Sequence, residues 1–172
     1  MLNKALKDDY DVVILDITMP GINGLDVLKQ IKAQKPKLPI LMLSVHPEEQ
    51  YAVRTLKAGA SGYLTKESAP DELIAAIRKV SVGKKYVSSS LAEKLALDLE
   101  IDHEKPLHET LSDREYQVMC MIASGKMLNE VADEPYLSVK TVSTYRTRIL
   151  EKMNMKSNIE LTHYAIKHGL VE

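Results

Sequence analysis

The chain has 172 residues, of which 45% are hydrophobic, and its formal net charge is −1. This length suits one medium domain or two small ones, and the near-neutral charge does not by itself indicate a nucleic-acid or membrane partner. A single cysteine excludes an internal disulfide, and no apolar run approaches the roughly 20 residues of a membrane span. We therefore expect a protein of the cytoplasm without a membrane segment.

The first half of the chain alternates short apolar runs with amphipathic segments. Strands are predicted at Val12–Asp16, Ile40–Leu43 and Gly62–Leu64. Helices are predicted at 2–8, 23–35, 48–58 and 70–82. The apolar positions expected to face inward are Leu25, Val27, Leu28 and Ile31 in the second helix and Leu73, Ile74 and Ile77 in the fourth. Strands separated by helices are typical of a parallel sheet with right-handed crossovers.

Three polar residues follow the three predicted strands. Asp16 ends the first, Ser44 directly follows the second, and Lys66 lies just beyond the third. The carboxyl ends of parallel strands share one edge of a sheet, where open α/β folds hold their chemistry. A carboxylate, a hydroxyl and an ammonium group together can accept a phosphoryl group and bind its oxygens. The pattern predicts a phosphoryl site at this edge.

No strand pattern is evident after Val87. A helix is predicted at Ser88–Leu99, followed by a polar segment at 101–109 that is typical of a linker. His103 and His108 in this segment are interpreted as solvated residues rather than metal ligands, because no cysteine lies near them. Four further helices are predicted at 112–124, 126–134, 138–153 and 157–168, the first of them opened by a capping box. Cys120 is predicted to be a buried small hydrophobe rather than a nucleophile.

The segments Lys126–Glu134 and Ser138–Met153, joined by a short turn, have the pattern of a helix-turn-helix. The positions of the second segment expected to face inward are Val139, Val142, Ile149, Leu150 and Met153. Those expected to face outward are Lys140, Thr141, Ser143, Thr144, Arg146, Thr147 and Arg148. Residues 138–156 hold five cations against one acid, a local charge of +4. A solvated amphipathic helix would also explain this pattern, but the hydroxyl-rich outer face favours DNA binding.

The chain resembles a known family in both halves. Residues 111–171, through "LSDREYQVMCMIASGK" and "LSVKTVSTYRTRILEKM", resemble a LuxR-type helix-turn-helix domain. Residues 2–85, through "DVVILDITMPGINGLDVLK" and "PILMLSVHPEEQYAVRTLKAGASGYLTK", resemble the receiver domain of a two-component response regulator. Together they resemble the NarL/FixJ group of transcriptional regulators. The resemblance implies an incomplete receiver domain at 1–86, a linker helix and linker at 87–108, and a DNA-binding domain at 109–172.

For the receiver half, the resemblance implies a flavodoxin-like sheet in which a sensor histidine kinase phosphorylates Asp16. Ser44, Tyr63 and Lys66 would support the phosphoryl site, and Asp16 with the carbonyl group of Thr18 would bind Mg²⁺. The chain would not be an enzyme, in agreement with the absence of a Gly-rich phosphate loop or catalytic histidine arrangement.

For the four-helix half, the resemblance implies sequence-specific binding to double-stranded DNA as a homodimer, with the helix at 157–168 as the dimer face. Ser143, Thr144 and Thr147 would face the bases. Lys140, Arg146 and Arg148 would anchor phosphate groups of the DNA backbone.

The chain departs from its family in the receiver half. Such sheets have the strand order 2-1-3-4-5, and this chain starts just before the third strand, so we expect the first two strands and their acidic pair to be missing. Asp8 and Asp9 lie at the opposite end of the strand at Val12–Asp16 and cannot replace that pair. We expect an incomplete magnesium site, impaired phosphorylation of Asp16 and an open sheet edge. A start within a longer reading frame and a shortened copy both explain the departure.

A second departure is Pro135, where the family has an apolar residue before the turn. Proline disfavours helix at the preceding residue, and three acids lie close by, so we expect weaker DNA binding than is typical. The runner-up hypothesis is a fragment that pairs with an intact response regulator through the open sheet edge and does not bind DNA.

Overall fold

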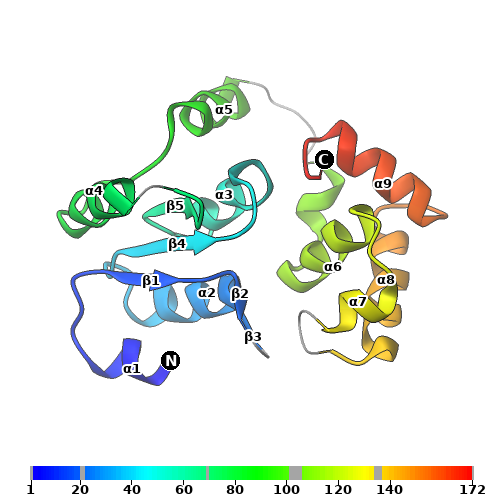
Figure 1. Cartoon of the computed structure of the whole chain (residues 1–172), viewed down its shortest axis with the longest axis horizontal. Coiled ribbons are helices and arrows are strands. Elements are labelled where there is room, and N and C mark those ends of the chain that lie inside the picture. Colours follow the sequence, from blue (N-terminus) through cyan, green and yellow to red (C-terminus); the bar gives the residue numbers. More distant parts are fainter. Residues whose placement is uncertain (1, 20–21, 69, 101–105, 134–136, 172) are drawn as a thin grey trace. The chain divides into compact units, whose positions relative to one another are not determined.

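The computed structural model describes residues 2–19, 22–68, 70–100, 106–133 and 137–171. The chain divides into two compact units. An N-terminal unit comprises the residues up to Met19 and Gly24–Ile101, and most of the C-terminal unit is Asp102–Glu172. Figure 1 shows strands and helices in the first unit and helices in the second. This is the predicted fold class, an α/β unit with a parallel sheet followed by an all-helical unit.

The main sheet of the N-terminal unit is parallel and has the order β1-β4-β5 (Figure 1). Its strands are β1 (Val13–Leu15), β4 (Ile40–Ser44) and β5 (Gly62–Thr65). All three predicted strands are confirmed, and among the described residues β1 lies at an edge, as expected. A second small sheet pairs β2 (Thr18–Met19) with β3 (Ile22–Asn23). It was not predicted, because two-residue strands carry no readable periodicity.

The helices of the N-terminal unit begin and end within two residues of the predicted positions. They are α1 (Leu2–Lys7), α2 (Gly24–Gln34), α3 (Glu48–Lys57), α4 (Pro70–Ser81) and α5 (Ser89–Glu100). Pro47 and Pro70 favour helix starts at α3 and α4, because their fixed φ suits the first turn and their missing N–H is not needed there. The Ser88 hydroxyl donates a hydrogen bond of 2.6 Å to Glu48, which ties the start of α5 to the start of α3.

The core of this unit lies between the sheet and its helices. Leu41, Leu64 and Ala76 form one buried cluster, and Leu73 and Ile77 of α4 pack against it. The four inward positions predicted for α2 are all buried. Alternate strand residues point to opposite faces, so β4 contributes Leu41 and Met42 to different sides of the sheet.

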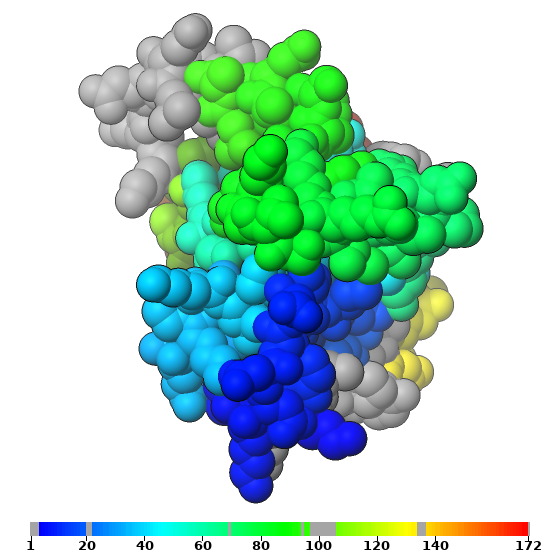
Figure 2. Space-filling view, turned by 90° about the vertical axis from the view of Figure 1, so that its left-hand side faces the viewer, coloured from blue at the N-terminus to red at the C-terminus, as the bar shows by residue number. Residues whose placement is uncertain are grey.

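One inward prediction for α4 is wrong. Ile74 is 48% exposed, whereas Ala76 and Val80 are buried. On a helix, positions 73, 76, 77 and 80 share one stripe, and position 74 falls outside it. The space-filling view shows α4, in green, as a ridge at the surface of the N-terminal unit (Figure 2), which leaves room for an outward side chain.

The C-terminal unit packs four helices around one core. They are α6 (Asp113–Ala123), α7 (Leu128–Asp133), α8 (Val139–Lys152) and α9 (Asn158–Lys167), preceded by the 3₁₀ helix η1 (Leu107–Thr110). The predicted capping box is confirmed, because Ser112 and Glu115 exchange hydrogen bonds. Nearly all of α6 is buried, including Cys120 at 2% exposure, as predicted.

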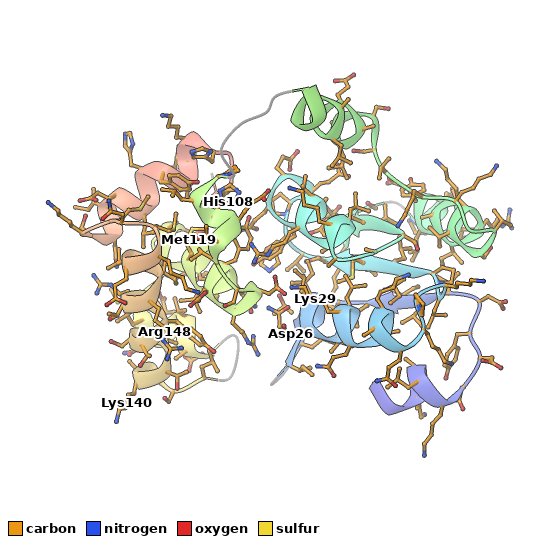
Figure 3. All side chains as sticks on the ribbon, turned by 180° about the vertical axis from the view of Figure 1, so that it is seen from behind. Asp26, Lys29, His108, Met119, Lys140 and Arg148 are labelled. Carbon is orange, nitrogen blue, oxygen red and sulfur yellow. The ribbon has the colours of Figure 1, made fainter. Side chains whose placement is uncertain are left out.

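The prediction for His108 is wrong. This residue lies in η1 and is half-buried, with its Nδ1 3.0 Å from the hydroxyl group of Tyr164 (Figure 3). Its ring also packs against the rings of Tyr116 and His168. Aromatic partners 8 to 60 residues away cannot be read from a local pattern, so the segment resembled a linker. His103 lies outside the described residues.

Smaller differences concern the helix-turn-helix segment. The helix α7 is shorter than predicted and ends at Asp133, and Pro135 lies outside the described residues. The N–H of Leu137 donates a hydrogen bond of 2.8 Å to the carbonyl oxygen of Ala132. Val139 is 45% exposed rather than inward, because it is the first residue of α8 and extends beyond the core.

No described helix is long and apolar enough to cross a membrane.

Candidate functional site

The first candidate site surrounds Asp16, at the carboxyl end of β1. Lys66 donates a hydrogen bond of 2.6 Å to its Oδ2, and the N–H of Thr18 donates one of 3.1 Å to its Oδ1. The ion pair is partly exposed, with the side chains of Lys66 and Asp16 at 43% and 25% exposure. Residues 50 positions apart in the chain therefore meet, as the strand-end pattern predicted.

Gly24 lies in close contact with the backbone of Asp16. A Cβ atom at this position would lie 2.0 Å from the carbonyl oxygen of Asp16 and 2.8 Å from Cα of Ile17. The N–H of Gly24 also donates to the carbonyl group of Ile17 at 2.9 Å. The start of α2 and the end of β1 are thus in contact through backbone atoms alone, which only glycine permits.

Ser44, at the end of β4, and Tyr63, in β5, are joined through His46. The hydroxyl oxygen of Ser44 accepts the N–H of His46 at 3.1 Å, and the hydroxyl group of Tyr63 donates to the carbonyl oxygen of His46 at 2.8 Å. Ser44 is fully buried and Tyr63 is 2% exposed, and this burial raises the pKa of the Tyr63 hydroxyl. The two predicted support residues are therefore coupled to each other by one short loop.

His46 was missed by the sequence reasoning. Its Nε2 lies 3.1 Å from Oγ1 of Thr18, and its ring packs on Tyr51 of α3 at a centroid distance of 4.9 Å. Thr18 thus contacts both Asp16, through its N–H, and His46, through its side chain. The signal available in the sequence was the position of His46 in the loop after a strand end that already held a site residue.

The two predicted magnesium ligands, Asp16 and Thr18, lie next to each other, with the N–H of Thr18 bonded to Oδ1 of Asp16. The described residues contain no group of three or more His, Cys, Asp or Glu side chains that could hold a metal ion. Mg²⁺ demands near-octahedral oxygen ligation, and at this site Lys66 already occupies one oxygen of Asp16. The ligands that the sequence predicted here are Asp16 and the Thr18 carbonyl group, so the remaining oxygen ligands of a bound Mg²⁺ would have to come from water or the phosphoryl group.

The second candidate site is the outward face of α8. Lys140, Ser143, Thr144, Thr147 and Arg148 are exposed, whereas Val142, Ile149 and Met153 are buried in the core. Positions 140, 144, 147 and 148 lie on neighbouring turns of one helix face. Figure 3 labels Lys140 and Arg148, which both project from α8. The predicted inner and outer faces are therefore confirmed for these residues, whereas Val139 is exposed and Thr141, Arg146 and Leu150 are half-buried.

A hollow of about 350 Å³ lies at the start of this face. It is lined by Ser138, Lys140, Thr141, Thr144, Tyr145 and Arg148. Ser138 caps α8, because its hydroxyl oxygen accepts the N–H of Thr141 at 3.1 Å. Tyr145 was not predicted as part of the site, since a half-buried aromatic residue at this spacing looks like a core position. The lining thus combines two cationic residues with four residues that carry a hydroxyl group.

Two of the five cations counted in the sequence have partners inside the unit. The Nε of Arg146 donates to Oδ1 of Asn158 at the start of α9, at 2.6 Å. Lys152 donates to Oε2 of Glu115, also at 2.6 Å. Burial alone would raise the pKa of Glu115, but the bonds from Lys152 and Ser112 outweigh it and hold that pKa below its usual value. These two cations join α8 to α9 and α6. The three cations left are exposed: Lys140 and Arg148 on α8, and Lys156 beyond its end.

The two threonines on the outer face bond to their own helix. The Thr144 hydroxyl donates to the carbonyl group of Lys140 at 3.0 Å, and the Thr147 hydroxyl donates to that of Ser143 at 3.2 Å. Threonine makes such bonds to the carbonyl group four residues back when its rotamer permits. Each Oγ1 therefore lies against the helix.

Comparison with known proteins agrees with this division. Residues 1–78 match the family of response regulator receiver domains, and residues 109–165 match the luxR family of bacterial regulatory proteins. The chain is 42% identical over 161 residues to the response regulator UvrY of Escherichia coli K12, covering 93% of this chain and 74% of UvrY. It is 38% identical to the response regulator GacA of Pseudomonas aeruginosa, covering 99% of this chain and 79% of GacA.

Solved structures show the same likeness. RcsB from Salmonella enterica serovar Typhimurium, bound to the promoter rprA in the presence of the phosphomimetic BeF₃⁻, matches with a TM-score of 0.52 and 28% identity, over 95% of this chain and 78% of RcsB. A complex of the response regulator RcsB with DNA matches with a TM-score of 0.50 and 28% identity, over 96% of this chain and 79% of that one. The chain therefore belongs to the response regulators that combine a receiver domain with a luxR-family regulatory domain.

Proposed function

We propose that this chain is a sequence-specific DNA-binding transcription regulator of a two-component phosphorelay, acting in the cytoplasm and without an enzymatic reaction of its own. The observation that carries the proposal is the outward face of α8, where Lys140 and Arg148 flank exposed hydroxyl residues. The RcsB structures bound to DNA support it, because they share the fold of this chain. The proposed domains are an incomplete receiver domain at 1–86, a linker helix and linker at 87–108, and a DNA-binding domain at 109–172.

In this proposal α8 enters the major groove of DNA. Lys140 and Arg148 anchor backbone phosphate groups, and the hollow beside them, with Thr141, receives one of these groups. Ser143, Thr144 and Thr147 face the base edges between the anchors. Arg146 is a further phosphate contact, although its Nε is already engaged by Asn158.

A mobility-shift titration at several salt concentrations tests this function. Wild-type protein should bind a 30-base-pair duplex with an affinity that falls steeply with salt. Arg148→Ala and Lys140→Ala should each weaken binding and lower the salt slope by about one, as expected for the loss of one phosphate contact. Lys84→Ala, an exposed lysine of the N-terminal unit, serves as the matched control. Binding without salt dependence, or equal effects of all three variants, would contradict the proposal.

We propose further that Asp16 is the phosphoacceptor for a sensor histidine kinase. A carboxylate oxygen of Asp16 attacks the phosphorus atom of the kinase's phosphohistidine, the P–N bond breaks and the kinase imidazole leaves. The Lys66 ammonium group and the Ser44 hydroxyl bind the transferred oxygens. The contact of 2.6 Å between Asp16 and Lys66 supports these roles, because it places the cation where the phosphoryl charge would develop. Tyr63 supports the site through its bond to the loop at His46.

Transfer to Asp16 should be impaired in the 172-residue chain. With Asp16 as the carboxylate proposed for Mg²⁺, we expect the charge of the phosphoryl group to be neutralised mainly by Lys66. Incubation with acetyl phosphate and MgCl₂, followed by intact mass measurement, tests this. We expect a substoichiometric adduct that Asp16→Asn removes. A stoichiometric adduct on Asp16 would contradict the impairment, and an equal adduct in Asp16→Asn would contradict the assignment of the acceptor.

We propose that the chain binds DNA as a homodimer through α9. Two isoleucines seven positions apart on this helix, Ile159 and Ile166, are 81% and 54% exposed. This spacing puts them on one face, where a second copy could cover them. The structure of two RcsB dimers on two parallel DNAs supports the assembly. Sedimentation of Ile159→Asp should show a shift towards monomer, whereas an unchanged dimer would exclude this face.

One observation favours the runner-up function, a fragment that pairs with an intact regulator. Among the described residues β1 has one paired neighbour, and Ile14 on this strand is 42% exposed. An exposed strand edge can pair with another chain. Size-exclusion chromatography with full-length UvrY distinguishes the two functions. A mixed complex that no longer shifts DNA would favour the fragment, whereas salt-dependent DNA binding by this chain alone would exclude it.

A further inference from the structure

The two threonines on the outer face of α8 present methyl groups rather than hydroxyl hydrogens to a ligand. Thr144 and Thr147 each use the hydroxyl hydrogen for a bond to a helix carbonyl group, at 3.0 and 3.2 Å. Each side chain has two heavy atoms beyond Cβ, namely Oγ1 and the Cγ2 methyl carbon. Because both residues are exposed while Oγ1 lies against the helix, the methyl group is the atom left towards solvent.

These two methyl groups lie close together on one surface. Residues three apart on a helix are neighbours, with Cβ atoms about 5–6 Å apart. Successive base pairs of DNA rise by about 3.4 Å, so the two side chains span one or two base-pair steps. Ser143, the third residue predicted to face bases, has no methyl group on Cβ and is chemically different from its neighbours.

Among the groups of the major groove, the one that matches a methyl surface is the C5 methyl of thymine. The acceptors of guanine and the donors of adenine and cytosine would require a hydrogen-bonding partner, which a methyl group cannot supply. We propose that α8 recognises thymine methyl groups through Thr144 and Thr147, so that its target half-site carries A·T pairs opposite these residues. This inference rests on the proposed DNA-binding function and adds a base preference to it.

The experiment replaces the thymine methyl group without changing base pairing. Duplexes are first recovered by the full chain from a random-sequence library, and one is resynthesised with deoxyuridine in place of each thymine in turn. Uracil lacks only the C5 methyl group. At the thymines opposite Thr144 and Thr147, each replacement should weaken wild-type binding about fourfold, the effect of exposing one methyl group.

Four variants then test whether the threonine methyl group or the threonine hydroxyl group causes the loss of affinity for deoxyuridine duplexes. Thr144→Ser and Thr147→Ser keep the hydroxyl bond but remove the methyl group, so each should abolish the uracil penalty at its own thymine. Thr144→Val and Thr147→Val keep a methyl group and remove the hydroxyl, so the penalty should persist. Thr110→Ser is the matched control, because its hydroxyl also bonds to a nearby carbonyl group, that of Leu107, away from α8. Melting followed by circular dichroism verifies that each variant is folded.

The possible outcomes separate this inference from the function on which it rests. Salt-dependent, sequence-selective binding with no penalty at any deoxyuridine position would overturn the thymine preference and leave the DNA-binding function intact. A penalty that survives in the Ser variants and disappears in the Val variants would show that the hydroxyl oxygens read the bases, which also overturns the inference. Failure of the wild-type chain to select any duplex would overturn both.

Discussion

The two candidate sites of this protein are built in opposite ways. In the N-terminal unit, the site residues bond to one another, as Asp16 does to Lys66 and as Ser44 and Tyr63 do through His46. On α8, the outward side chains bond to their own helix, as Thr144 and Thr147 do, or extend from it. The first site is assembled from separate strand ends, and the second is a property of one helix.

The difference shows which changes each site tolerates. A site assembled from strand ends depends on the backbone positions that bring those ends together, so a distant substitution can disrupt it. A helix face depends on the contacts that hold the helix against its core, and individual outward side chains can change without loss of the fold. Four substitutions test this comparison, from the largest expected effect to the smallest.

The largest effect is expected for Gly24→Ala. The new methyl group would overlap the carbonyl oxygen of Asp16, so β1 or α2 must move, at a cost of about 3 kcal/mol in the free energy of unfolding. Gly83→Ala is the control, because its Cβ would meet nothing within 4 Å and its positive φ alone should cost about 1 kcal/mol. Hydrogen exchange read by mass spectrometry locates the loss, and equal losses for the two variants would show that the close approach at Asp16 is unimportant.

The second substitution, Glu115→Gln, weakens the support of α8. It removes the charge that binds Lys152 and should cost about 1–2 kcal/mol at neutral pH. Because the folded state lowers the pKa of this carboxyl group, its contribution is full above the ordinary Glu value and is lost as the pH falls through the lowered value. Urea melts across the acid range should therefore converge for wild type and variant once the pH is below the lowered pKa of Glu115.

Glu160→Gln is the matched control for this substitution, since Glu160 also occupies the third position of a Ser-capped helix but is exposed. Its effect should be smaller. A constant difference between wild type and Glu115→Gln at every pH would show that the charge of Glu115 does not contribute.

The third substitution, Arg146→Ala, distinguishes a structural cation from a DNA-binding one. Loss of the bond to Asn158 should cost about 1 kcal/mol, whereas the salt slope of DNA binding should change less than in Arg148→Ala. Asn158→Ala removes the other partner, so the double variant should lose little more than either single one. If the stability losses of the two single variants add in the double variant, and the salt slope of Arg146→Ala falls as much as that of Arg148→Ala, then Arg146 contributes to DNA binding and not to the packing of α9.

The smallest effect on stability is expected for Asp16→Asn. The ion pair with Lys66 is partly exposed, and such pairs contribute at most about 1 kcal/mol. The chain should therefore remain folded in thermal melts while it loses its phosphoacceptor. A loss of several kcal/mol would mean that Asp16 is chiefly a structural residue of the β1 edge.

The sequence by itself determined the three strands of the main sheet, the positions of the α-helices and most of the division of α8 into two faces. Strand and helix patterns are local, and the helical period alone separates Val142 and Ile149 from Lys140 and Arg148. The strand-end rule also brought Asp16 and Lys66 together correctly, because parallel strands end at one edge of a sheet. In both cases a regular geometry converts spacing along the chain into position in space.

Tertiary structure alone decided how side chains bond once they meet. His46 joining Ser44 to Tyr63, His108 packing against Tyr164, and Arg146 bound by Asn158 all involve partners that no local period relates. The outward placement of Ile74 depends on which stripe of α4 the sheet covers, and hydrophobicity does not reveal that choice. These features depend on contacts between residues far apart in the chain, which form only when the helices and strands pack together.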